Sequence, residues 1–309
     1  MILQVGLLVI GFCLLVKGAD WFVEGAAGIA KKLGIPELII GLTIVAMGTS
    51  LPEAAVSITS ALKNNPGITI GNVAGSNIMN VLVILGITAV ITNVAIQKST
   101  QYVELPFMLG ITALLMFFGY TGAQITFWEG VIFWILFIGF LAYLFVMAKK
   151  GQNQEDDEEV KDLPLWKCLL FILVGAAMIA FGSDFAVNGA SGLARFFGMS
   201  ERFIGLTIVA FGTSLPELVT SVTAAKKGNV GIAIGNIVGS NIFNILFVTG
   251  TTALICAVPF EPKFLVDAAV ALASGLVLWF GTVRTKELRR PCGIVMLLCY
   301  AAYFVYLCV

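Results

Sequence analysis

The sequence has 309 residues, of which 59% are hydrophobic and 12% are charged, and its formal net charge is zero. A soluble globular domain is typically about half apolar and about one quarter charged, so this composition excludes an ordinary soluble domain. Histidine is absent, which removes the commonest transition-metal ligand and the usual proton shuttle. The six cysteines lack CxxC spacing and lie in or beside apolar segments, so we interpret them as buried small hydrophobes.

Long apolar runs divide the chain into ten predicted transmembrane helices, since a span needs about 20 apolar residues. These helices cover residues 2–30, 36–62, 67–93, 103–119, 125–148, 165–195, 200–225, 230–255, 262–281 and 291–308. No basic residue precedes the first run, so we expect a span there and not a cleaved signal peptide. The pattern predicts an all-α polytopic membrane protein.

One polar segment, KKGQNQEDDEEVKD at 149–162, separates five spans from five. We expect a first repeat at 1–148, an acidic linker at 149–164 and a second repeat at 165–309. The linker acids lack the spacing and the glycine of an EF-hand, so we interpret them as a solvated loop and not as a Ca²⁺ sensor.

Three segments of the first half recur 164 residues later. GLTIVAMGTSLPE at 41–53 returns as GLTIVAFGTSLPE, GNVAGSNIMN at 71–80 as GNIVGSNIFN, and GADWFVEGA at 18–26 as GSDFAVNGA. Because each half has an odd number of spans, the second half must enter the membrane upside down relative to the first. Inverted repeats of this kind are typical of secondary transporters.

Lysine and arginine residues in the loops predict the orientation. With the N-terminus outside, thirteen basic residues lie on the cytoplasmic side and four on the outer side. We therefore expect a multi-pass protein of the cell membrane, with both termini outside and the linker in the cytoplasm.

The repeated GTSLPE motif places a proline and an acid inside the second and seventh predicted spans. Pro52 and Pro216 lack an N–H and crowd the carbonyl four residues earlier, so we expect each helix to break there. Carbonyls freed in this way must find partners or face a water-filled cavity. The oxygens that the two breaks gather come from the carbonyls near Ala46, Thr49, Ala210 and Thr213, the hydroxyls of Thr49, Ser50, Thr213 and Ser214, and the carboxylates of Glu53 and Glu217.

Ligation by oxygen alone is what hard cations such as Ca²⁺ prefer. The second motif adds neutral oxygens four residues apart, from Ser76 with Asn80 and from Ser240 with Asn244. Its GxxxG spacing favours close helix packing, and interhelical hydrogen bonding without ion contact stays the alternative for these four residues. One divalent ion would neutralise both glutamates, and an empty site would leave two uncompensated charges, which favours exchange over an open pore.

Asp20, Glu24 and Asp184 lie in glycine-rich stretches toward the ends of the first and sixth spans. We favour an interfacial or capping role for these acids. The repetition of Asp20 as Asp184 keeps a gating role open.

The paired motifs GTSLPE and GNxxGSNI resemble the two alpha-repeats of the cation/calcium antiporter (CaCA) superfamily, and are most similar to those of its prokaryotic sodium/calcium exchangers. The resemblance covers essentially the whole chain, including the ten spans and the short central loop. It implies four ion sites at the repeat interface, one for Ca²⁺ and up to three for Na⁺. It also implies that the first and sixth helices slide to alternate access.

The resemblance implies roles for individual residues as well. Glu53 and Glu217, with the carbonyls of Thr49 and Thr213, would bind Ca²⁺. Flanking Na⁺ sites would be completed by Ser50, Ser76, Ser214, Ser240 and the carbonyls of Ala46 and Ala210. Asn80 and Asn244 would line the middle. Some relatives have an aspartate in place of Asn244, and asparagine here argues against K⁺ co-transport and leaves fewer groups to carry protons.

The sequence therefore predicts a sodium/calcium antiporter with alternating access, no cofactor and no enzymatic activity. A proton-coupled antiporter for Ca²⁺ or another hard divalent ion is the alternative, and a passive channel also stays open. An intramembrane hydrolase finds no support, because histidine is absent and neither motif contains Lys or Arg. The expected partners are the two ions and the lipid bilayer, with no nucleic acid and no obligatory protein partner.

Overall fold

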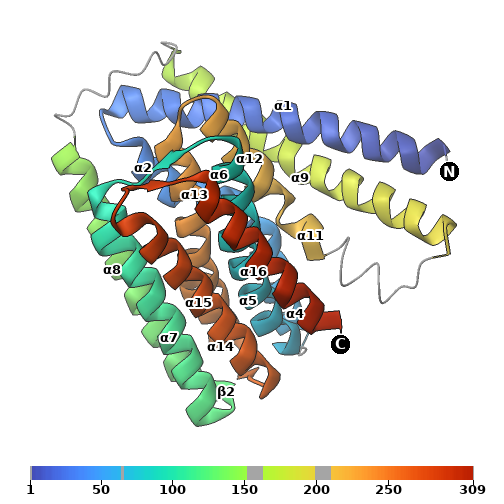
Figure 1. Cartoon of the computed structure of the whole chain (residues 1–309), viewed down its shortest axis with the longest axis vertical. Helices are drawn as coiled ribbons and strands as arrows, with labels where there is room; N and C mark the ends of the chain where they lie inside the picture. Colours follow the sequence, from blue (N-terminus) through green and yellow to red (C-terminus); the bar gives the residue numbers. More distant parts are fainter. Residues whose placement is uncertain (1, 64–65, 152–162, 199–209, 309) are drawn as a thin grey trace.

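The computed structural model describes residues 2–63, 66–151, 163–198 and 210–308. In chain order the helices are α1 (Ile2–Leu33), α2 (Glu37–Ile40), η1 (Gly41–Val45), α3 (Ala46–Thr49), α4 (Leu51–Leu62), η2 (Pro66–Ile68), α5 (Thr69–Met79), η3 (Asn80–Leu85), α6 (Gly86–Ile91), η4 (Thr100–Glu104), α7 (Leu105–Gly122), α8 (Phe127–Gly151), α9 (Leu165–Phe196), α11 (Ala210–Thr213), α12 (Leu215–Lys226), α13 (Val230–Phe243), η6 (Asn244–Thr249), α14 (Gly250–Ile255), α15 (Lys263–Val283) and α16 (Arg290–Cys308). Of the segments labelled η, η2 is a 3₁₀-helix and the other four are π-helical. Figure 1 shows α1 and α9 side by side along one edge of a helical bundle, with their ends projecting beyond it.

Nine helical stretches in the described part of the chain match predicted spans. Eight are single stretches that are long and apolar enough to cross a membrane, and the ninth joins Glu37–Thr49 to Leu51–Leu62 with a bend of 50°. The predicted span 200–225 lies partly outside the described residues, as does most of the predicted linker. The prediction of a helical polytopic membrane protein is confirmed at this level.

Four two-residue strands depart from the all-α prediction. β1 (Val94–Ala95) pairs antiparallel with β4 (Glu287–Leu288), and β2 (Gln124–Ile125) pairs antiparallel with β3 (Val258–Pro259). Both pairs join a loop of the first half to a loop of the second half. Two residues are too short to produce an alternating pattern, so the sequence carried no signal for these strands.

Both GTSLPE motifs depart from regular helix at their serine. Helix α3 ends before Ser50, where φ is −87° and ψ is 9°, and α4 follows with its proline in the first turn. Helix α11 likewise ends before Ser214, where φ is −92° and ψ is 3°, and α12 follows in the same way. A proline in the first turn loses no helical hydrogen bond, because the N–H groups there have no intrahelical acceptor. The proline therefore sets where the second helix begins.

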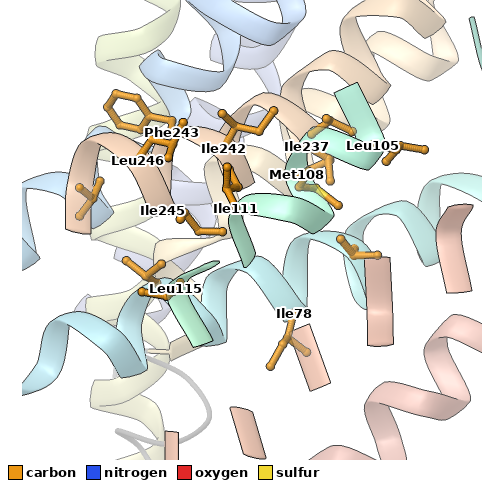
Figure 2. Close-up of a cluster of buried hydrophobic side chains, with 14 of the residues drawn as sticks. Ile78, Leu105, Met108, Ile111, Leu115, Ile237, Ile242, Phe243, Ile245 and Leu246 are labelled. Atoms are coloured by element: carbon orange, nitrogen blue, oxygen red, sulfur yellow. The ribbon is translucent and has the colours of Figure 1, made fainter. Parts of the chain in front are cut away.

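Apolar side chains fill the bundle around the repeated asparagine motif. Ile78 on α5, Met108 and Ile111 on α7, and Ile237 and Ile242 on α13 belong to one buried cluster (Figure 2). Burial of a large aliphatic side chain contributes roughly 1.5–3 kcal/mol, although the lipid reference state reduces this figure. Polar residues of α5 and α13, such as Ser76 and Ser240, belong to the site described below.

Helices α1 and α9 pack backbone to backbone along two glycine series of period seven. On α1, Gly11, Gly18 and Gly25 lie against α9, and on α9, Gly175, Gly182 and Gly189 lie against α1. A Cβ added at Gly18 would lie 2.9 Å from the carbonyl oxygen of Gly175. Small residues permit such close approach of membrane helices, where packing is the main source of association. The two helices therefore form one tightly packed antiparallel pair.

We predict that Gly18→Leu destabilises this pair, because the new side chain would overlap the α9 backbone at a cost of about 1–3 kcal/mol. Gly6→Leu is the matched control, since a Cβ at Gly6 meets no atom within 4 Å. Thermal unfolding in detergent should show a midpoint lower by about 3 °C or more for Gly18→Leu and an unchanged midpoint for Gly6→Leu. Equal midpoints for the two variants would contradict the packing argument.

Candidate cation site

Two buried glutamates stand at the centre of the candidate site. Glu53 lies in the first turn of α4 and Glu217 in the first turn of α12, and each has 1% of its surface exposed. The helix dipole and the unpaired N–H groups of a first turn favour a negative charge. The two carboxylates are close enough to repel one another, so the first turns alone do not balance their charge.

The helix break of the first half contacts the glutamate of the second half. Ser50 donates its hydroxyl to Glu217 Oε1 at 2.8 Å. Ser240 of α13 donates to the carbonyl oxygen of Ala46 at 3.3 Å, which also crosses between the halves. Ser76 lies within hydrogen-bonding range of the Glu53 carboxylate. The polar groups of the two halves therefore interlock around the glutamates.

Four carboxylate and amide oxygens in this region lack a hydrogen-bond donor among the described residues. They are Oε2 of Glu53, Oε2 of Glu217, Oδ1 of Asn80 and Oδ1 of Asn244. Asn80 begins η3, which packs against α12, and Asn244 begins η6, which packs against α4. A buried acceptor without a partner costs about 1–3 kcal/mol, and an ionised one costs more. Such a group of oxygens is suited to a positive ligand.

Two equivalent amide networks support the helices that carry the glutamates. Asn72 donates to the Glu53 carbonyl at 3.2 Å and to the Ser57 hydroxyl at 2.9 Å. Asn236 makes the same two bonds, to the Glu217 carbonyl at 3.4 Å and to the Ser221 hydroxyl at 2.9 Å. The oxygen of the Asn236 amide also accepts the hydroxyl of Thr49 at 3.0 Å. These bonds fix the broken helices against α5 and α13.

The structure brings together most of the residues predicted from sequence. Contacts described above link Glu53, Glu217, Ser50, Thr49, Ala46, Ser76 and Ser240, and Asn80 and Asn244 lie on segments that pack against the glutamate helices. Ser214 is buried, and its hydroxyl has no hydrogen-bond partner among the described residues. Thr213 ends α11 and Ala210 begins it, directly after residues outside the described part.

Sequence reasoning missed the asparagines and serines that support the site. Asn72 and Asn236, like Ser57 and Ser221, are separated by the 164-residue repeat offset and occupy equivalent networks. Asn77 and Asn241 are a third such pair, and they bond to one another. Identity at equivalent repeat positions was the available signal for all six residues.

The donor set has the chemistry that hard cations prefer. It combines two carboxylates with hydroxyl, amide and carbonyl oxygens, and no cluster of three or more His, Cys, Asp or Glu side chains occurs among the described residues. Nitrogen- and sulfur-preferring metals are typically held by imidazole or thiolate ligands, whereas Ca²⁺ and Na⁺ take oxygen. The arrangement is therefore suited to Ca²⁺ or Na⁺.

A cavity of about 380 Å³ adjoins the broken helices. It lies between the α1/α9 pair and the two breaks, and Phe22, Thr49, Pro52, Ala180 and Pro216 are among its lining residues. Thr49 therefore borders both the cavity and the polar site. Movement of the α1/α9 pair would change the shape of this cavity.

The profile of one protein family, described as sodium/calcium exchanger protein, matches residues 3–146 and 167–309. The chain belongs to this sodium/calcium exchanger family. It is 33% identical to the sodium/calcium exchanger MaX1 of Methanosarcina acetivorans, covering 97% of both chains. It is 36% identical to the inner membrane protein YrbG of Escherichia coli, covering 96% of this chain and 94% of that protein.

A solved structure of the sodium-calcium exchanger NCX_Mj has the same fold. The TM-score is 0.85 at 33% sequence identity, and the superposition covers 98% of each chain. That exchanger was studied for extracellular ion exchange and binding-site occlusion, in crystals soaked with Na⁺ and Sr²⁺. Membership of the CaCA superfamily, predicted from the GTSLPE and GNxxGSNI motifs, is thus confirmed.

Proposed function

We propose that this protein is a sodium/calcium antiporter that binds its ions between Glu53 and Glu217. The observation that carries the proposal is the set of four donor-free buried oxygens on Glu53, Glu217, Asn80 and Asn244. Two buried carboxylates near one another require about two positive charges, which one Ca²⁺ or two Na⁺ would supply. Competition between these two ways of neutralising one site is the physical basis of exchange.

The proposed Ca²⁺ site uses both glutamates together with the carbonyls of Thr49 and Thr213. The proposed Na⁺ sites flank it and use Ser50, Ser76, Ser214 and Ser240, with the carbonyls of Ala46 and Ala210. Asn80 and Asn244 complete the middle of the site. The bond from Ser240 to the Ala46 carbonyl, which brings together two of the proposed Na⁺ ligands, supports this assignment.

We infer further that the chain consists of two inverted five-helix repeats, 1–148 and 165–309, joined by a cytoplasmic linker. The reciprocal strand pairs support a two-fold relation, because β1 and β3 stand 164 residues apart and each pairs with the other half. The π-segments η3 and η6 keep the same offset. With the basic residues inside, both termini face outward from the cell membrane.

An asymmetry between the halves supports alternating access. On α1, Asp20 and Glu24 pair with Lys227 at the end of α12, the first at 2.5 Å and the second at 3.9 Å. The equivalent residues of the other half are Asp184 on α9 and Lys63 at the end of α4, and no ion pair joins these two described residues. In the proposed orientation Lys227 lies inside and Lys63 outside. We infer a state closed toward the cytoplasm.

Packing of the helices agrees with this asymmetry. Helix α1 packs along α12, whereas α9 and α4, both fully described, make no packing of comparable extent. Sliding of the α1/α9 pair by a few ångström would release Lys227 from α1 and bring Asp184 toward Lys63. The same sequence elements would then close the outer side, as alternating access by inverted repeats requires.

The proposed function predicts that Glu53→Gln abolishes Na⁺-driven Ca²⁺ uptake. Replacing one of two charged ligands costs at least about 2–3 kcal/mol, or about 100-fold in transport at low Ca²⁺. Glu129→Gln is the matched control. Glu129 lies in the first turn of α8, away from the broken helices, and accepts hydrogen bonds from the backbone N–H and the hydroxyl of Thr126. Proteoliposomes loaded with Na⁺ would be diluted into Na⁺-free or Na⁺-matched buffer containing radioactive Ca²⁺.

The same vesicles distinguish the coupling ion. Uptake that follows the outward Na⁺ gradient and ignores an imposed pH gradient supports Na⁺ coupling. Uptake driven by the pH gradient alone would replace the proposal with proton-coupled exchange. Uptake that needs neither gradient would indicate a channel.

The ion pairs of Lys227 with Asp20 and Glu24 act as a latch on the cytoplasmic side in this proposal. The latch predicts that Lys227→Gln favours the inward-facing state. A partly exposed ion pair is worth up to about 1 kcal/mol, so the apparent Michaelis constant for Ca²⁺ at the cytoplasmic face should fall by about threefold to fivefold. Lys226→Gln is the control, because Lys226 is exposed and forms no ion pair within the described residues. Transport into inside-out vesicles measures this constant, and equal values for the two variants would contradict the latch.

A further inference from the structure

Four buried asparagines form one hydrogen-bonded group where the two halves meet. Asn77 donates its side-chain amide to the carbonyl oxygen of Asn241 at 3.2 Å, and Asn241 donates to the carbonyl oxygen of Asn77 at 3.2 Å. The two residues are 164 positions apart, so each is the repeat equivalent of the other. They are 4% and 3% exposed. A symmetric pair of amides therefore joins α5 to α13.

The second part of the group ties the site asparagines to this pair. Asn80 donates its side-chain amide to Oδ1 of Asn241 at 2.9 Å. Asn244 donates in the same way to Oδ1 of Asn77 at 3.1 Å. Each supporting asparagine thus donates to a carbonyl of the opposite half and accepts an amide from the opposite half.

This pattern determines which way each amide faces. If Asn77 were turned over, its NH₂ group would meet the NH₂ group of Asn244, and its oxygen would meet the carbonyl oxygen of Asn241. Both contacts would pair like groups, so only the observed orientation satisfies the network. The same argument holds for Asn241 and its partners.

The backbone of α5 and α13 makes the group possible. Each helix changes to π geometry at its site asparagine, at Asn80 and at Asn244. At this junction the carbonyl of Asn77 accepts the backbone N–H of Asn80, and the carbonyl of Asn241 accepts that of Asn244. A carbonyl oxygen has two lone pairs, so each of these oxygens also accepts the side-chain amide of the opposite half. The carbonyls at the start of the π-segments therefore join the halves.

The consequence for the ions follows from the shape of an amide, whose oxygen and nitrogen lie on opposite sides of one carbon. Because the nitrogens of Asn80 and Asn244 are held by the supporting pair, their oxygens must point away from it. These are the two amide oxygens that lack a donor. An NH₂ group turned toward the glutamates would instead repel a cation.

We propose that Asn77 and Asn241 are positioning residues that hold the amide oxygens of Asn244 and Asn80 toward the transported cations. This inference rests on the proposed function, because it assigns a role to residues behind the same ion site. The pairing is crossed, so that Asn77 acts on Asn244 and Asn241 acts on Asn80. The crossed pairing separates this role from general packing.

The test is a double-mutant cycle on the apparent Michaelis constant for Ca²⁺ in the Na⁺-loaded vesicles. Asn77→Leu keeps the backbone carbonyl that binds Asn241, so Asn80 stays held while Asn244 is released. We expect the constant to rise about tenfold, equal to one lost hydrogen bond of about 1.4 kcal/mol, with little change in maximal rate. In an Asn244→Ala background the same substitution should add less than about twofold.

The matched control combines Asn77→Leu with a substitution of Asn80, the site asparagine that Asn77 does not hold. In an Asn80→Ala background, Asn77→Leu should retain its full effect, because Asn80 is held by Asn241. Asn77→Asp in its protonated form keeps an oxygen for the Asn244 amide and a hydroxyl donor for the Asn241 carbonyl, so it should raise the constant by less than about threefold at mildly acidic pH, which guards against a folding failure of the leucine variant. Equal and additive effects in both backgrounds would overturn the positioning role.

The outcome also separates this inference from the function it rests on. If the unsubstituted protein shows no Na⁺-driven uptake, the proposed function fails. If uptake is present but Asn77→Asp is as damaging as Asn77→Leu, the function stands and the positioning role fails.

Discussion

Two like charges buried next to each other are the constraint on which the rest of this structure depends. Glu53 and Glu217 are almost fully buried and repel one another. Leaving two carboxylates uncompensated at this depth costs several kcal/mol. The stabilisation that the first turn of a helix gives to a negative charge is far smaller. The surrounding hydroxyl, amide and carbonyl oxygens add no charge of their own. Bound cations or protons would therefore stabilise the site, and in the proposed antiporter the exchange of one cargo for another avoids the empty state.

Local departures from α-helix occur where polar groups must face inward. The GTSLPE motifs leave helical geometry at Ser50 and Ser214, and the GNxxGSNI motifs change to π geometry at Asn80 and Asn244. In a membrane interior, irregular backbone is tolerated only where protein or a polar cavity satisfies it. Here Ser50, Asn80 and Asn244 each donate a side-chain hydrogen bond to the opposite half. The irregular backbone positions thus coincide with residues of the candidate cation site.

The parts of the site that sequence could predict are those with a strong local cost. A proline costs a helix its regular backbone and a buried acid costs solvation energy, so the duplicated motif made Glu53 and Glu217 the leading candidates, and both are buried. Asn77 and Asn241 were missed because GxxxG spacing already explained their motif as helix packing. Their role depends on contacts between the halves, which no single segment encodes. The short strand pairs were missed for a similar reason, since two residues leave no periodic signal.

The sequence also could not predict which side of the molecule is closed, because the two halves carry equivalent residues. Asp20 and Asp184 are repeat equivalents, as are Lys227 and Lys63, yet only the first acid pairs with its lysine among the described residues. If the halves are inverted repeats, as proposed, the same contacts with the roles of the halves exchanged define a second arrangement. The partly exposed Asp20–Lys227 pair contributes about 1 kcal/mol at most. In the proposed cycle, an ion pair of that strength would bias the equilibrium between the two states without preventing the transition.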